Sequence, residues 1–193
     1  MAYPNNKAYQ AGNCALDPAL YSGLLNGVTN LAQALTILDG LGGIRSHQRI
    51  DFLRATLLQE IQGMWTRTMN AAYMFGGYIG NTTFPLNGDC FDISLYAPST
   101  GTYAIYLNAP LNADEGKLKV FIDEVQIGTA AGYDLYAAGP NYANLITITT
   151  LSAGGSLVLT GGYHRIKFRV DGLNGASSNY IVRLQKLELV RTA

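Results

Sequence analysis

The spacing of apolar residues divides the chain into a region with helical periodicity before position 76 and a region of alternating residues after position 81. In the first region, one apolar stripe recurs at spacings of four and three residues, as on one face of a helix. The stripe consists of Leu24, Val28, Leu31, Leu35 and Leu38. Asp17 and Pro18 form a helix start signal, and the glycines from Gly40 onward end the pattern. We therefore predict a helix between these points, preceded by an extended arm at residues 1–16.

A second pattern with the same periodicity extends from about Ser46 to Phe75 and predicts a helix about 42 Å long. Its apolar stripe consists of Ile50, Leu53, Leu57, Ile61, Met64 and Trp65. A helix of this length must bury its stripe, either on a copy of itself or, alternatively, on its own β domain or on the first helix. Charged residues make up 13% of the chain, about half of the typical share, which favours self-association. Both stripes are therefore predicted oligomer-interface residues.

From residue 81 onward, apolar residues alternate with other residues, which predicts β-strands. The alternating sets are Phe91, Ile93 and Leu95; Tyr103, Ile105 and Leu107; Leu118, Val120 and Ile122; Ile146 and Ile148; Leu157 and Leu159; Ile166, Phe168 and Val170; and Tyr180, Val182 and Leu184. Glycine and Asx turn signals separate these sets. Several short strands with no helical pattern between them predict an antiparallel β-sandwich with jelly-roll or Greek-key connections.

The predicted fold class is therefore α+β by segment, with an N-terminal arm and helices followed by the antiparallel β-sandwich. The predicted domains are the arm at residues 1–16, a helical attachment and oligomerisation region at 17–80, and the β-sandwich at 81–193. In the last strand, the alternation changes phase between Leu184 and Leu187. A slip of one residue predicts a β-bulge near Gln185 and Lys186.

The charge balance excludes several classes of partner. The chain has 13 Lys and Arg residues and 13 Asp and Glu residues, so its formal net charge is zero. This balance leaves no excess positive charge to attract a nucleic acid or an anionic membrane surface. The amino terminus lacks the apolar core of a secretion signal, and no apolar run predicts a membrane helix. We expect synthesis in the cytosol with Cys14 and Cys90 reduced, although a disulfide between them stays an alternative.

Few residues are candidates for catalysis or metal binding. Of the two histidines, His164 at a strand start predicts a structural role with its ring bonded to the backbone, and His47 predicts a helix-start or solvated side chain. No zinc spacing, EF-hand loop, P-loop or dinucleotide motif is present. A single Ca²⁺ held by Asp114, Glu115 and backbone carbonyls is the remaining metal alternative. We therefore predict no enzymatic activity, no cofactor and no metal.

Tyrosine is the one residue type in clear surplus, with 13 copies in the chain. Tyr133, Tyr136 and Tyr142 lie within residues 128–144, a long segment with low charge and no clear periodicity. A tyrosine ring combines a large apolar face with a polar tip, which suits protein interfaces and stacking on sugar rings. We predict that these three residues contact a ligand or a partner; the alternative is that the segment covers one end of the sandwich.

Four short segments of the second region carry a resemblance to a known family. They are 97–103 (APSTGTY), 118–124 (LKVFIDE), 161–168 (GGYHRIKF) and the closing strand at 180–190 (YIVRLQKLELV). Together they resemble non-catalytic carbohydrate-binding modules with a galactose-binding-like jelly roll. The resemblance covers residues 82–193 and implies a β-sandwich with a glycan as ligand. Where such modules carry stacking aromatic residues in their loops, this sequence has tyrosines and no Trp, and their acidic calcium cluster has no clear counterpart.

The layout of the whole chain resembles that of a bacteriophage virion protein, such as a capsid decoration, head-fibre or tail-fibre subunit. This resemblance implies a non-enzymatic structural protein, made in the host cytoplasm and located in the virion. It also implies a homo-oligomer, a trimer by analogy with fibres, whose arm and helices attach to other virion proteins. The alternative function is a carbohydrate-binding module or lectin-like receptor-binding domain that recognises cell-surface glycan.

Overall fold

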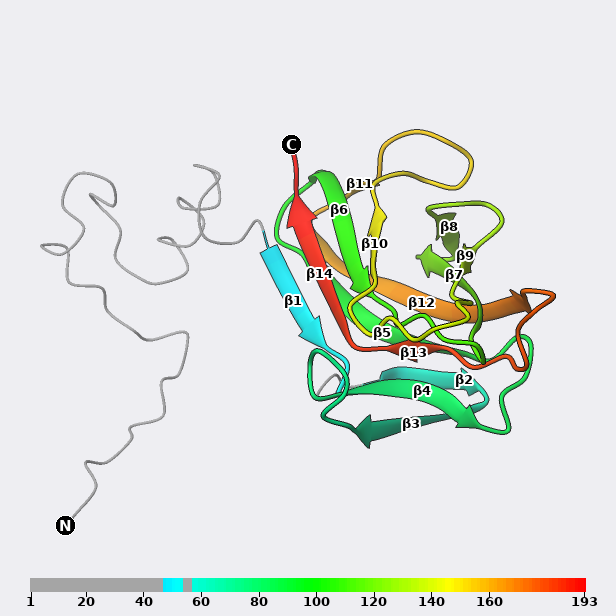
Figure 1. Ribbon diagram of the computed structural model, residues 1–193. Coiled ribbons are helices and arrows are strands. Elements are labelled where there is room, and N and C mark those ends of the chain that lie inside the picture. Colours follow the sequence, from blue (N-terminus) through cyan, green and yellow to red (C-terminus); the bar gives the residue numbers. More distant parts are fainter. Residues whose placement is uncertain (1–46, 54–56) are drawn as a thin grey trace, which may run out of the picture. The chain divides into compact units, whose positions relative to one another are not determined.

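The computed structural model describes residues 47–53 and 57–193, which form strands joined by turns and loops. Two larger sheets face each other, and a third, smaller sheet lies beside them at the bottom of Figure 1. The predicted arm and the stripe from Leu24 to Leu38 lie outside the described residues. In the part of the chain that the structure describes, no helix is long and apolar enough to cross a membrane.

The first sheet is antiparallel, with the strand order β1, β14, β6 and β10, and β11 also pairs with β6. Its strands are β1 (His47–Asp51), β6 (Gly101–Asn108), β10 (Leu145–Ile148), β11 (Val158–Leu159) and β14 (Lys186–Arg191). Ile105 and Leu107 of β6 and Leu187 and Leu189 of β14 are buried. Because successive side chains point to opposite faces, the residues between them form the outer face of the sheet.

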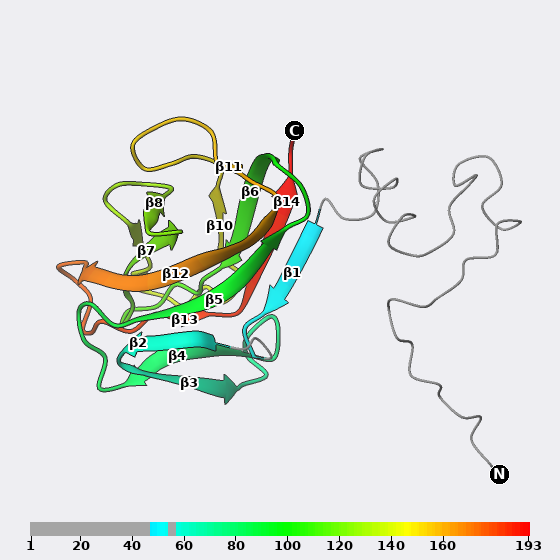
Figure 2. The ribbon, with the colours of Figure 1, turned by 180° about the vertical axis from the view of Figure 1, so that it is seen from behind.

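The second sheet is also antiparallel, with the strand order β2, β5, β12, β7 and β8, and β9 pairs with β7. Its strands are β2 (Leu57–Gln62), β5 (Cys90–Ala97), β7 (Gly116–Ile122), β8 (Val125–Ile127), β9 (Tyr133–Asp134) and β12 (Gly162–Leu173). Figure 2 shows β12 and β5 side by side across this layer. Their inward side chains, among them Phe91, Ile93, Ile166 and Phe168, are buried.

The third sheet has the strand order β13, β4 and β3, and its residue Trp65 packs against the aromatic side chains of the core. Its strands are β3 (Met64–Met69), β4 (Gly77–Thr83) and β13 (Arg183–Leu184). The Trp65 ring of β3 lies 4.5 Å from the Phe91 ring, centroid to centroid. Phe52, directly after β1, places its ring edge-on to Phe168 at 5.3 Å. Edge-to-face packing of this kind stabilises a core beyond the area that it buries.

The predicted β-sandwich is confirmed. Ile105, Val120, Phe168 and Val182, which alternation places on the inward face, are all fully buried. The change of phase after Leu184 arises from a break between two strands, and not from the β-bulge that was predicted near Gln185 and Lys186. The strand ends there, and the chain passes at Gln185 from the third sheet to the first.

The predicted helix from Ser46 to Phe75, and with it the α+β fold class, is wrong, because the described part of the chain is all-β. Residues 47–69 contain the strands β1, β2 and β3, which pair with strands of the sandwich. Gly63 separates β2 from β3 with a φ of 87°, a left-handed conformation that a continuous α-helix does not contain. The apolar spacing resembled a helical stripe only because it skipped this glycine and the β-branched residues Thr66 and Thr68.

The six residues of that predicted stripe are separated in the structure. Their positions are as follows: Ile50 in β1, Leu53 after β1, Leu57 and Ile61 in β2, and Met64 and Trp65 in β3. Ile50 packs against the core, Trp65 is buried within it, and Met64 is exposed. These residues therefore form no continuous helical interface. Oligomerisation through the stripe from Leu24 to Leu38, outside the described residues, stays a prediction.

Candidate functional site

The outer face of the first sheet contains an open groove with a volume of about 380 Å³. Its floor consists of Tyr106 and Asn108 of β6 and Lys186, Glu188 and Val190 of β14. In the ladder between these strands, Tyr106 lies opposite Glu188 and Asn108 lies opposite Lys186. The floor residues alternate with the buried residues of both strands, so the same period of two builds the core and the floor.

The groove has two walls that come from distant parts of the chain. Met74 and Phe75, from the loop between β3 and β4, form the wall beside β1 and β14. Ala143 and Leu145 form the wall beside β10. Met74 is 57% exposed and Leu145 is 52% exposed, so both walls present apolar surface to solvent. A groove with apolar walls and a few polar floor groups is typical of small-ligand sites.

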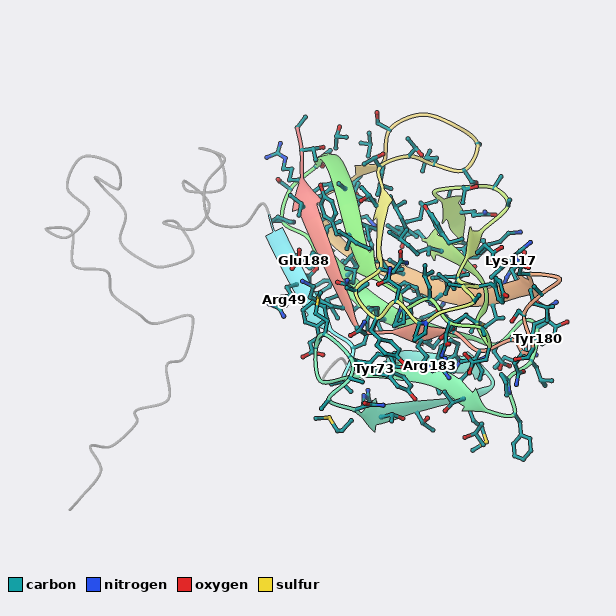
Figure 3. The ribbon with its side chains drawn as sticks, viewed as in Figure 1. Arg49, Tyr73, Lys117, Tyr180, Arg183 and Glu188 are labelled. Carbon is teal, nitrogen blue, oxygen red and sulfur yellow. The ribbon has the colours of Figure 1, made fainter. Side chains whose placement is uncertain are left out.

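Cationic side chains contact the Phe75 ring from two strands. The Arg49 guanidinium carbon lies 5.6 Å from the ring centroid, and the Lys186 ammonium nitrogen lies 4.4 Å from it. Lys186 Nζ also donates a hydrogen bond to Glu188 Oε1 at 2.7 Å. Arg49 is opposite Glu188 in the ladder between β1 and β14, and Figure 3 shows these two residues on neighbouring strands. The attraction of cations to a ring face orients Phe75 at the edge of the groove.

Asparagine side chains fix the wall beside β10. Asn108 Nδ2 donates to the backbone oxygen of Asn144 at 3.2 Å. Asn144 Nδ2 in turn donates to the backbone oxygen of Ala109 at 2.8 Å. This reciprocal pair attaches the segment that carries Ala143 to the end of β6, which also supplies the floor.

A tyrosine cluster supports the other wall. The Tyr73 ring, two residues before Phe75, lies 4.6 Å from the Tyr78 ring and 4.4 Å from the Tyr142 ring. Burial raises the pKa of Tyr73 to about 12, so its hydroxyl stays protonated at neutral pH. The contact with Tyr142 joins the loop between β3 and β4 to the segment that leads into β10.

A buried charge cluster adjoins these tyrosines (Figure 3). Arg183 donates to both oxygens of Asp114 at 2.9 Å and to Glu115 Oε1 at 2.5 Å. Burial raises the pKa of Glu115 to about 8, although the charge of Arg183 opposes this shift. The hydrogen bond from Arg183 lowers the pKa of Asp114. The two carboxylates considered for Ca²⁺ thus face an arginine, and the described residues contain no group of three His, Cys, Asp or Glu side chains placed to hold a metal.

The three tyrosines predicted to contact a ligand or a partner lie in different surroundings in the structure. Tyr133 lies in β9 and packs against the core, and burial raises its pKa. Tyr136 follows β9, and its backbone N–H donates to Asp134 Oδ1. Tyr142 contacts Tyr73 behind the groove wall. A contact of these residues with a partner stays a prediction, and only Tyr142 adjoins the groove.

His164 and Cys90 occupy structural positions. The two ring nitrogens of His164 lie 2.7 Å from Asp123 Oδ2 and 2.8 Å from the backbone oxygen of Thr160. Cys90 is a buried free thiol, and burial raises its pKa. A raised thiol pKa disfavours the reactive thiolate.

Phe75, Tyr106, Lys186 and Glu188 are the groove residues that sequence reasoning missed. Tyr106 carried a usable signal, because it is a large aromatic residue out of phase with the inward residues Ile105 and Leu107. Lys186 and Glu188 lie in the same outward phase of their strand. Phe75 gave no such signal, since its place at the groove depends on the path of a loop.

Comparisons with known proteins give fold neighbours but no sequence relative. No family model matches the sequence, and no curated protein sequence matches it. A Paenibacillus xanthan lyase is similar in structure, with a TM-score of 0.61 and 16% identity over 75% of this chain and 13% of that chain. The CBM36-1 domain of a multidomain xylanase from the hindgut metagenome of Trinervitermes trinervoides has a TM-score of 0.50 and 15% identity over 76% of this chain and 98% of that chain.

A family 35 carbohydrate-binding module from an environmental isolate is similar to the same extent, with a TM-score of 0.50 and 17% identity. The similarity extends over 76% of this chain and 98% of that chain. The fold is a jelly-roll β-sandwich like that of carbohydrate-binding modules. At these identities the similarity shows the fold alone, so the ligand has to be argued from the groove.

Proposed function

We propose that this protein is a non-catalytic glycan-binding module that binds a polysaccharide chain in the groove on the outer face of the first sheet. The observation that carries the proposal is the combination of the Tyr106 and Phe75 side chains with the Lys186–Glu188 pair in one open groove. A pyranose ring offers an apolar face that stacks on aromatic side chains, as well as hydroxyls that donate and accept hydrogen bonds. Lys186 supplies donors and Glu188 supplies acceptors for such hydroxyls.

The charges of the groove favour an uncharged polysaccharide. Lys186 is paired with Glu188, and Arg49 contacts the Phe75 ring while lying opposite Glu188 in the ladder. Asp51 lies opposite Lys186. Two cations and two carboxylates therefore balance each other, and the groove offers no excess charge to an acidic glycan.

The fold of the carbohydrate-binding modules named above supports this proposal more than a purely structural role in a virion. A place on a phage particle, attachment to other virion proteins and a trimeric state stay separate predictions. A glycan-binding groove is compatible with each of them, because a receptor-binding domain and a free module require the same recognition chemistry.

A glycan array probed with the full chain tests the proposal, followed by calorimetric titration with the retained polysaccharide. We expect binding to neutral polysaccharides and at least a tenfold loss of affinity in Tyr106→Ala, which corresponds to about 1.4 kcal/mol. Phe84→Ala is the matched control, because Phe84 is an aromatic residue that is 82% exposed and does not line the groove.

Two results would overturn the proposal. If the unmodified chain retains no glycan on the array, the glycan-binding function is wrong. If Tyr106→Ala binds as tightly as Phe84→Ala, glycan binds elsewhere and the groove is not the site.

A further inference from the structure

Gln185 is a fully buried polar residue at the point where the chain changes from the third sheet to the first. Its backbone N–H donates to the oxygen of Asn108 at 3.0 Å, and its backbone oxygen accepts from the N–H of Phe52 at 3.1 Å. These two bonds fix its backbone between the end of β6 and the segment after β1. Gln185 therefore sits next to the groove floor, one residue before Lys186.

The side chain of Gln185 bonds to both groove walls. Its Oε1 accepts a hydrogen bond from the backbone N–H of Phe75 at 3.3 Å. Its Nε2 donates to the backbone oxygen of Tyr142 at 2.5 Å. Phe75 is far from Tyr142 in the sequence, yet one planar carboxamide contacts the main chain of both. Because the donor and the acceptor of a carboxamide lie at a fixed separation, this group determines the distance between the two segments.

We propose that Gln185 is a positioning residue that holds the two walls of the groove at the separation required by the bound polysaccharide. The proposal rests on the glycan-binding function proposed above, since it assigns Gln185 a role in the specificity of that groove. Gln185 itself does not line the groove, so it acts through Phe75 and through the segment that carries Ala143 and Leu145. A change at Gln185 should alter the walls while the floor residues Tyr106 and Glu188 keep their ladder.

The chemistry of the carboxamide makes the two hydrogen bonds separable. Gln185→Leu removes both the acceptor and the donor at similar side-chain volume. Gln185→Glu keeps the acceptor for the Phe75 N–H, but an ionised carboxylate has no hydrogen to donate to the Tyr142 oxygen. When that carboxyl group is protonated, its O–H can donate, so acidification should restore the second bond.

The test compares the full chain with Gln185→Leu, Gln185→Glu and the control Gln126→Leu. The control removes the same chemical group at a position that does not line the groove. There, Gln126 Nε2 donates to the backbone oxygens of Thr129 and Ala130. Two quantities are measured: the hydrogen-exchange rate of the Phe75 amide, and the affinity for the polysaccharide that the unmodified chain retains. The affinity is measured for all variants from acidic to alkaline pH.

In Gln185→Leu, we expect exchange of the Phe75 amide to become at least tenfold faster and the affinity to fall at least tenfold. In Gln185→Glu, we expect the Phe75 amide to stay protected. Because burial raises the pKa of a carboxyl group at this position, the affinity should be low at alkaline pH and recover on acidification. Gln126→Leu should match the unmodified chain in both measurements. A merely structural role would reduce stability without producing the pH-dependent recovery of affinity.

The proposal is overturned if Gln185→Leu leaves the protection of the Phe75 amide and the affinity unchanged. It is also overturned if, between acidic and alkaline pH, the affinity of Gln185→Glu changes no more than that of the unmodified chain. If the unmodified chain binds no glycan, the function of the groove is wrong, and amide exchange still shows whether Gln185 holds the wall. If Gln185→Leu does not fold, the pH dependence of the affinity of Gln185→Glu tests the proposal instead.

Discussion

The outer faces of the two larger sheets are built by the same alternation but carry different chemistry. On the first sheet, Tyr106, Lys186 and Glu188 form the floor of a groove between two walls. On the second sheet, the outward residues of β12 form ion pairs with acidic side chains. The pairs are Arg165 with Asp92, Lys167 with Glu124, and Arg169 with Asp171.

The difference shows what converts a sheet face into a binding site. Alternation supplies an outward row of side chains on either sheet, and both rows contain ion pairs, such as Lys186 with Glu188 on the first sheet. On the second sheet, acidic residues of the same domain bond to the cations. On the first sheet, Phe75 and Leu145 enclose the row from both sides and leave an open space above it.

The largest expected effect comes from Phe168→Ala, which should damage both faces together. Phe168 is fully buried, and its ring contacts those of Phe52 and Phe91 between the sheets. Loss of the ring removes buried apolar surface and leaves a cavity, so the free energy of unfolding should fall by about 3–5 kcal/mol. Chemical denaturation measures this change, with Phe84→Ala as the exposed control. A loss below about 1 kcal/mol would contradict the assignment of Phe168 to the shared core.

A smaller effect should separate the two faces. Asp92 is fully buried and pairs with Arg165, whose side chain is 40% exposed. Asp92→Asn should lower the free energy of unfolding by about 1–3 kcal/mol, because a charged hydrogen bond in a buried position is weakened. Its glycan affinity should be unchanged, whereas Tyr106→Ala should lose affinity and keep its stability. If Asp92→Asn weakens binding as much as Tyr106→Ala does, the two faces are not functionally distinct.

The pH dependence of stability should include a contribution from His164 on the second sheet. Burial lowers the pKa of His164, but its bonds to Asp123 and to the Thr160 oxygen, together with the charge of Asp123, outweigh burial and raise the pKa. The contribution of His164 to stability is therefore fully present below about pH 6.5, its ordinary pKa, and is lost as the pH rises through the raised value. Urea unfolding over this range should show a decline that His164→Phe reduces. An unchanged slope in His164→Phe would show that another group is responsible.

The smallest effects concern the tyrosines near the first sheet. Tyr142→Ser removes the ring that contacts Tyr73, so it should cost about 1 kcal/mol of stability and weaken glycan binding by displacing the wall. Tyr136→Ser should leave the free energy of unfolding within about 0.5 kcal/mol of the unmodified chain. Thermal melts of the two variants give the comparison. Equal melting temperatures would show that the Tyr73–Tyr142 contact does not stabilise the wall.

Alternation of apolar residues was sufficient to predict the strands from β5 to β14 that contain Phe91, Ile105, Val120 and Phe168. Each strand there is long enough to show its period, and each has a buried inward face. The segment from Ser46 to Phe75 was predicted as a helix because Ile50, Leu53 and Leu57 match a helical spacing. Short strands joined by turns produce the same spacing by chance, and the turn at Gly63 was the local signal against a helix.

In the strands that contain Phe91, Ile105, Val120 and Phe168, the sequence by itself determined which residues face inward, because the period of two is a local property of each strand. It also placed Tyr106 in an outward phase and marked the change of phase at Gln185. Only the tertiary structure brought Phe75 and Leu145 to opposite sides of one groove and placed the Gln185 carboxamide between their segments. These contacts join residues that are far apart in the chain, and their geometry depends on how the sheets pack and where the loops lie, which no local pattern encodes.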